Sequence, residues 1–370
     1  AWYAIANQDY DQAIAQCRAI LERYPDDTEV AGRLSTLLMG ESRLDEARDV
    51  ALRAYNADPR NPSIINTLGG TYSLLGRHAD AISMLHQYVA LSPGDANAHD
   101  SLGLAYQWAG RYQDAVAAYT KAIELNPDFE VPIIHLGNVY YQLGRYRDAI
   151  RQYERFIALG DFDQEIARGY GSIAMVHLAR GNHALAQAAA RRSEAADDTH
   201  VLSFLIAAER GDRAAATALW RSAERRDAGR GAGTSRRWAE YLRGRYAQLT
   251  GRTDEALAHY RATLRQSPLT YSMESLEEVL GQGYLQLGRL DEAVVEFERV
   301  LGINPNYARA RLGLAQALER RGDRARARVE YELFLNIWRD ADADAPLLVT
   351  AKRRLAALSG GRLKARTGDE

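Results

Sequence analysis

The residues best suited to catalysis or metal binding are eight histidines and one cysteine, and their spacing does not assemble a site. No two histidines stand in an HExxH motif or in another close pairing typical of metal ligands. We therefore interpret the histidines as surface or packing residues, namely His78, His86, His99, His135, His177, His183, His200 and His259. Cys17 is the sole cysteine, which excludes an intrachain disulfide and a cysteine-bound metal centre. We predict no catalytic residue, no metal and no cofactor.

A glycine-rich segment, GRGAGTS (229–235), has some features of a phosphate-binding loop. It lacks the GK[ST] ending and follows no strand pattern, so we interpret residues 224–236 as a flexible loop or hinge. The arginines around it leave open the alternative of a dock for a phosphorylated or acidic peptide. They are Arg221, Arg225, Arg226, Arg230, Arg236 and Arg237.

Composition narrows the class of protein. With 370 residues, 46% hydrophobic and 26% charged, the chain has the composition of an ordinary soluble protein. A net charge of -2 gives no general attraction to nucleic acid or anionic lipid, and no apolar run is long enough for a membrane helix. The start, AWYAIANQDY, is neither a signal peptide nor an initiator Met, so we expect a fragment of a longer protein. We predict no nucleic-acid partner and no membrane insertion, and favour the cytoplasm over the periplasm.

The same residue types return every 34 positions, which indicates a repeat protein. Alanine occupies one column, at Ala13, Ala47, Ala81, Ala115 and Ala149. Further columns are Pro25, Pro59, Pro93 and Pro127; Leu68-Gly69, Leu102-Gly103 and Leu136-Gly137; Tyr72, Tyr106 and Tyr140; and Gly76, Gly110 and Gly144. Cys17 shares its column with Ala51, Leu85, Tyr119 and Tyr153, so we predict a buried structural thiol.

Each unit reads as two amphipathic helices. Leu102, Gly103 and Tyr106 lie three or four residues apart, hence on one face of a first helix. Gly110 suits the C-terminal cap of that helix. Asn126-Pro127 ends the second helix, because proline donates no hydrogen bond and disfavours helix in the residue before it.

This pattern resembles the tetratricopeptide repeat. Residues 28–61, 62–95, 96–129 and 130–163 match in strict phase, and residues 1–27 resemble part of a preceding unit. Residues 164–223 resemble two degenerate units, the first with a longer first helix and the second with a shortened one. Three more units follow over 237–341, then a capping helix over 342–359 and a disordered tail over 360–370. The resemblance implies an all-α, right-handed superhelical solenoid of about nine to ten repeats, with a possible junction of two arms at 224–236.

The resemblance also implies the function, which is a non-catalytic scaffold that holds a peptide or helix of a partner protein in a concave groove. The first helices line that groove in this family, so removing the packing columns from them leaves the candidate contact residues. These are Asn66, Asn97, Asp100, Gln107, Trp108, Ile134, Asn138 and Tyr141. Asn66, Asp100, Asn138 and Tyr141 are expected to share one surface.

Other functions stay open at this point. The segment ARVEYELFLNIWRDADADAPLLVTAKRRLAAL resembles the end of repeat regions attached to bacterial Ser/Thr kinases and to some transcriptional regulators, which implies a sensory or substrate-recruiting role. A glycosyltransferase with substrate-recruiting repeats and a solenoid for carbohydrate or lipid are further alternatives. The lysine carboxylate clamp of chaperone-binding members is not expected, because its positions hold Gly32, Thr36, Asn66, Gly70, Asp100 and Leu104. The sequence leaves the partner and the oligomeric state undetermined.

Overall fold

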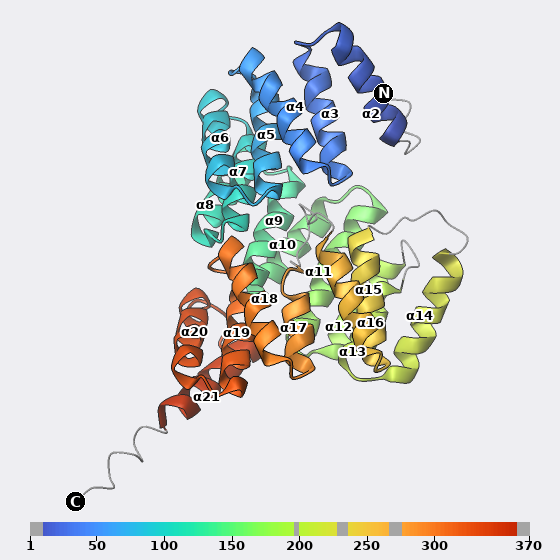
Figure 1. Cartoon of the computed structure of the whole chain (residues 1–370), viewed down its shortest axis with the longest axis vertical. Coiled ribbons are helices and arrows are strands. Elements are labelled where there is room, and N and C mark those ends of the chain that lie inside the picture. Colours follow the sequence, from blue (N-terminus) through green and yellow to red (C-terminus); the bar gives the residue numbers. More distant parts are fainter. Residues whose placement is uncertain (1–9, 196–199, 228–235, 266–275, 361–370) are drawn as a thin grey trace, which may run out of the picture. The chain divides into compact units, whose positions relative to one another are not determined.

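The fold consists of helix-turn-helix repeats, and within each of its units neighbouring helices such as α7 and α8, or α19 and α20, pack against one another (Figure 1). The computed structural model describes residues 10–195, 200–227, 236–265 and 276–360. These residues form twenty helices, α2 to α21, and contain no strand. The prediction of an all-α helical-repeat fold is confirmed.

The chain divides into two compact units, residues 1–132 and 133–370. The boundary lies inside α9 (Glu130–Gln142), whereas the sequence placed a possible junction of two arms at 224–236. The helices of unit 1 are α2 (Tyr10–Arg23), α3 (Thr28–Gly40), α4 (Leu44–Ala57), α5 (Pro62–Leu74), α6 (His78–Leu91), α7 (Ala96–Trp108) and α8 (Tyr112–Leu125).

Unit 2 is also built of helix pairs, and its helices vary more in length. In the region predicted to hold two degenerate repeats, α11 has 17 residues and α13 has nine. The helices after α9 are α10 (Tyr146–Leu159), α11 (Asp163–Ala179), α12 (His183–Glu194), α13 (Val201–Glu209), α14 (Arg213–Asp227), α15 (Arg236–Leu249), α16 (Thr253–Leu264), α17 (Val279–Gln286), α18 (Leu290–Ile303), α19 (Ala308–Arg321), α20 (Arg324–Ile337) and α21 (Pro346–Gly360). Part of the predicted loop, 228–235, and the tail 361–370 lie outside the described residues.

Small residues let the two helices of a repeat approach closely. A Cβ atom added to Gly103 of α7 would lie 2.7 Å from the ring of Tyr119 on α8. The same relation joins Gly137 to Tyr153, at 2.5 Å. Both tyrosines are completely buried, so the small column and the aromatic column form one contact inside each repeat.

An arginine after the turn glycine organises the turn in several repeats. Arg111 lies over the ring of Tyr106, 4.5 Å from the centroid, and its Nε donates to Asp114 at 2.8 Å. Arg145 repeats both contacts with Tyr140 and Asp148. The guanidinium thus joins the end of a first helix to the first turn of the second, where a carboxylate is favoured by the helix dipole.

Candidate functional site

Unit 1 presents a face made by its first helices, because α3 contacts α5 and α5 contacts α7. Asn66, Leu104 and Trp108 are half-buried there, with part of each side chain accessible. Asn97 is also half-buried, and its amide donates to the hydroxyl of Tyr88 at 3.2 Å. Accessible amide and aromatic groups on neighbouring helices can contact a polypeptide laid across them.

Five of the eight predicted contact residues are interior. Asp100 is 4% exposed, Gln107 6%, Ile134 1%, Asn138 2% and Tyr141 5%. These five side chains were expected to face a partner, but the structure buries all of them. Removing the known packing columns was not sufficient, because the remaining first-helix residues include the acceptors that buried hydroxyl groups need.

Tyrosines of the second helices account for two of these acceptors. The Tyr119 hydroxyl donates to Oε1 of Gln107 at 2.8 Å, and the Tyr153 hydroxyl donates to Oδ1 of Asn138 at 2.9 Å. Tyr260 donates to Gln248 in the same way, at 2.7 Å. The signal was present in the sequence: a tyrosine in a buried column requires an acceptor for its hydroxyl on the facing helix.

The C-terminal segment of unit 2 is bound to the beginning of the same unit. Trp338 donates its indole N–H to the carbonyl oxygen of Gln142 at 2.9 Å, and its ring meets that of Tyr146 edge-on with 6.1 Å between centroids. The amide of Asp342 donates to the carbonyl oxygen of Gly144 at 3.0 Å. Trp338 is 2% exposed, so it fills a buried place between segments 196 residues apart in the sequence.

Charged groups reinforce this closure of unit 2. The Arg147 amide donates to the Asp342 carboxylate at 3.1 Å. Asp344 forms ion pairs with Arg180 at 2.9 Å and with Arg147 at 3.3 Å. The pKa of Asp344 is lowered by a backbone hydrogen bond and, against the opposing effect of desolvation, by the hydrogen bond from Arg180 and the charges of Arg180 and Arg147. The segment from Trp338 to Asp344, just before α21, is therefore the part of the chain that docks.

Unit 2 contains a cavity of about 210 Å³ that is partly open to solvent. Trp338 lines it together with five tyrosines, Tyr141, Tyr146, Tyr241, Tyr260 and Tyr307. Burial raises the pKa of Tyr146 to about 12, so its hydroxyl stays protonated at neutral pH. The cavity is smaller than the roughly 300–1,000 Å³ of sites for drug-sized ligands, and suits one amino-acid side chain.

Two arginines and two glutamates also line the cavity, and their pairing is unequal. Glu278, with a side chain 7% exposed, receives Nε of Arg309 at 2.9 Å and a short hydrogen bond from the Tyr307 hydroxyl. Arg309 also donates to the Tyr141 hydroxyl at 3.3 Å. Tyr141 thus lines this cavity, whereas the sequence predicted that it would face a groove. The Glu278 carboxylate is therefore matched by donors.

Arg245 is less well matched. Its ion-pair partner, Glu209, lies 3.3 Å away and has a side chain that is 57% exposed, against 21% for Arg245. Among the described residues the buried Nε of Arg245 has no hydrogen-bond partner, although the side chain also shares a hydrogen bond with Tyr260. A buried donor without an acceptor is unfavourable and suits a ligand that supplies one. The sequence did not single out Arg245, Glu278, Tyr307 or Trp338, since each stands alone and no spacing relates them.

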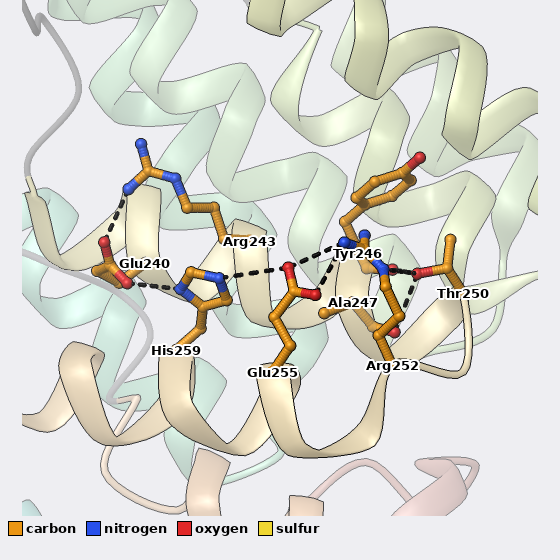
Figure 2. A network of polar contacts seen from close by, with 8 residues as sticks. All are labelled: Glu240, Arg243, Tyr246, Ala247, Thr250, Arg252, Glu255 and His259. Carbon is orange, nitrogen blue, oxygen red and sulfur yellow. Dashed lines mark hydrogen bonds and ion pairs between the residues drawn. The ribbon is translucent and has the colours of Figure 1, made fainter.

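A polar network of histidine, arginine and carboxylate side chains joins α15 to α16 (Figure 2). Nδ1 of His259 lies 2.8 Å from Oε2 of Glu240, and its Nε2 lies 3.8 Å from Glu255. Burial by itself raises the pKa of Glu240, but hydrogen bonds and charge from His259 and Arg243 outweigh burial and lower it. The network fixes one helix of the repeat to the other (Figure 2).

Metal binding and thiol chemistry receive no positive support. The described residues contain no group of three histidine, cysteine or acidic side chains arranged to hold a metal ion. Cys17 is 1% exposed and burial raises the pKa of its thiol, as a packing role requires.

No helix in the described ranges has both the length and the apolar character needed to cross a bilayer. Of the arginines near the glycine-rich loop, Arg230 lies outside the described residues.

The fold and the site define a helical-repeat scaffold with an accessible first-helix face in unit 1 and an aromatic, charged cavity in unit 2. Family models for the tetratricopeptide repeat match residues 4–59, 96–129, 135–200, 237–262 and 284–352. The chain belongs to the tetratricopeptide repeat family. Repeat arrays of this kind provide extended surfaces for protein interaction.

Among curated proteins, a tetratricopeptide repeat and J domain-containing co-chaperone, DNJ1, from Fusarium oxysporum f. sp. lycopersici is 36% identical over 83 residues. The match covers 22% of this chain and only 15% of that protein. Solved structures with a similar fold include MamA, at 28% identity and a TM-score of 0.36, covering 43% of this chain and 92% of that one. A thermophilic TPR protein of Thermus thermophilus, TTC0263, is 22% identical with a TM-score of 0.44, covering 49% of this chain and 98% of that one.

Proposed function

We propose that the chain is a non-catalytic scaffold that binds an extended or helical segment of a partner protein along the first helices of unit 1. The observation that carries this proposal is the row of half-buried amide and aromatic side chains on α5 and α7, represented by Asn66 and Trp108. Packing accounts for the small and aromatic columns of these helices, but gives no reason for a partly accessible tryptophan and asparagine on them.

The physical advantage of such a face is its length. A segment laid across several first helices can approach the contact area of a standard protein interface without any deep pocket. Tryptophan contributes a large contact area, and asparagine can donate to and accept from a peptide backbone. Trp108 is therefore expected to dominate the affinity, with Asn66 fixing the position of the bound segment.

Site-specific photocrosslinking tests this proposal directly. A benzophenone amino acid replaces Leu104 on the proposed face in one variant and Lys121 on α8 in another; Lys121 is half-exposed and lies on a second helix. We expect a partner polypeptide to crosslink from position 104 and not from position 121. Trp108→Ala should reduce the crosslink from position 104 at least about tenfold, with the helical circular-dichroism signal unchanged.

The result that contradicts the proposal is equal crosslinking from the two positions, or crosslinking from position 104 that survives Trp108→Ala and Asn66→Ala together. The alternative of a sensory or substrate-recruiting region in a kinase or transcriptional regulator stays a prediction. None of the relatives described above carries either of those names.

A further inference from the structure

The cavity of unit 2 contains a cation that lacks a matching buried anion. Arg245 lies in the lining and shares a hydrogen bond with Tyr260. Within the described residues its Nε has no acceptor, and its carboxylate partner, Glu209, is largely exposed to solvent. The other carboxylate of the lining, Glu278, is already held by Arg309 and Tyr307. Among the charged residues described in the lining, Arg245 is therefore a cation whose charge is balanced by a solvent-exposed carboxylate.

The chemistry of the lining selects among ligand groups. A cationic group would be placed near Arg245 and Arg309, with Glu278 already engaged. An apolar group would add no acceptor for Arg245, and a neutral amide would bring an acceptor but no negative charge, hence a weaker interaction. A carboxylate supplies an acceptor and the missing negative charge, and its two oxygens match the planar fork of a guanidinium.

We propose that this cavity binds the carboxylate of an acidic side chain, glutamate or aspartate, of the partner polypeptide, with Arg245 as the recognising residue. This inference rests on the proposed function, because it assigns the carboxylate to a protein partner. The volume of about 210 Å³ admits one side chain, and the surrounding tyrosines and Trp338 contact its aliphatic part. The hydrogen bond from Tyr260 to Gln248, at 2.7 Å, holds the amide beside Arg245 in one orientation.

The test observes the arginine directly. In ¹⁵N NMR spectra of the whole chain, the Nε–H signal of Arg245 is assigned by its loss in Arg245→Gln. Two probes, Ac-Gly-Glu-Gly-NH2 and Ac-Gly-Gln-Gly-NH2, are blocked at both ends. The third, Ac-Gly-Gly-Gly-OH, has a free C-terminal carboxylate and no acidic side chain. We expect a saturable shift of the Arg245 signal with the glutamate peptide, and binding about 10- to 100-fold weaker with the glutamine peptide.

Three variants make the assignment specific. Arg245→Gln should abolish binding, whereas Arg243→Gln, an exposed arginine on the same helix α15, should leave it unchanged. Glu209→Gln should tighten binding, because it removes the carboxylate that competes for Arg245 and is itself too exposed to be required for folding. This opposite effect distinguishes recognition from damage to the fold.

Equal binding of the glutamate and glutamine peptides, or unchanged binding in Arg245→Gln, would overturn the inference. Binding of Ac-Gly-Gly-Gly-OH alone would also overturn it, because the cavity would then recognise a chain terminus and not a side chain. Persistence of the crosslink from position 104 in that case would show that the cavity proposal fails and the scaffold proposal stands. Peptide binding at Arg245 without any crosslink from position 104 would show the reverse.

Discussion

Gly144 can be used to test how the C-terminal segment around Trp338 is held against the beginning of unit 2. Its φ is +70°, a conformation that strains any residue with a Cβ atom, and an added Cβ would lie 2.8 Å from two ring atoms of Trp338. Gly181 has a nearly identical φ of +73°, but an added Cβ meets nothing within 4 Å. Gly144→Ala and Gly181→Ala therefore share the backbone cost and differ in the contact with Trp338.

The expected magnitudes follow from these two terms. A left-handed conformation costs a residue with a Cβ about 1–2 kcal/mol, so Gly181→Ala should lose about that much stability locally. Gly144→Ala adds the cost of forcing a methyl group into a packed contact, about 1–3 kcal/mol. The ring of Trp338 has little room to yield, because its indole N–H is bound to Gln142 and the residue is 2% exposed.

Hydrogen exchange measures this difference where it arises. The reporters are the indole N–H of Trp338 and the backbone N–H of Asp342, which donate across the closure. An extra 1–3 kcal/mol should accelerate exchange of both protons about 5- to 150-fold in Gly144→Ala relative to Gly181→Ala. Equal protection of these protons in the two variants would refute the reasoning, and would mean that Trp338 docks without depending on the glycine.

Other parts of the structure give three further predictions. Tyr119→Phe leaves the buried Oε1 of Gln107 without its donor, so urea unfolding of unit 1 should show a loss of about 1 kcal/mol; no loss would mean that water replaces the hydroxyl. Gly103→Ala should destabilise by about 1–3 kcal/mol through contact with the Tyr119 ring, whereas Gly70→Ala, with nothing within 4 Å, should stabilise by up to about 1 kcal/mol; thermal unfolding that gives both the same sign would contradict the packing argument. The pKa of Glu240 is lower in the folded chain than its unfolded value of 4.5, so its contribution to stability is present above that value and is lost as the pH falls through the folded pKa. Urea titrations from pH 6 to pH 3 should therefore show a smaller loss of stability for Glu240→Gln than for the parent chain, and parallel curves would exclude this role.

The interior position of Gln107 and Asn138 shows the limit of a column-by-column interpretation. Both residues look like surface positions when only helical periodicity is considered, because they are polar and lie beside the packing columns. Each is instead the acceptor for a buried tyrosine, Tyr119 or Tyr153, on the facing helix. Periodicity identifies the buried face of a helix, but it does not identify the polar residues that this face recruits.

The sequence by itself determined the repeat, because every signal for it is local. Columns such as Gly103 with Tyr119, and turn residues such as Gly110, act within one 34-residue unit, where a few residues decide helix ends and the distance between helices. Only the tertiary structure decided how unit 2 closes and what its cavity contains. Trp338 and Gln142 stand 196 residues apart, and small changes in the packing of each intervening repeat add up to determine whether they meet.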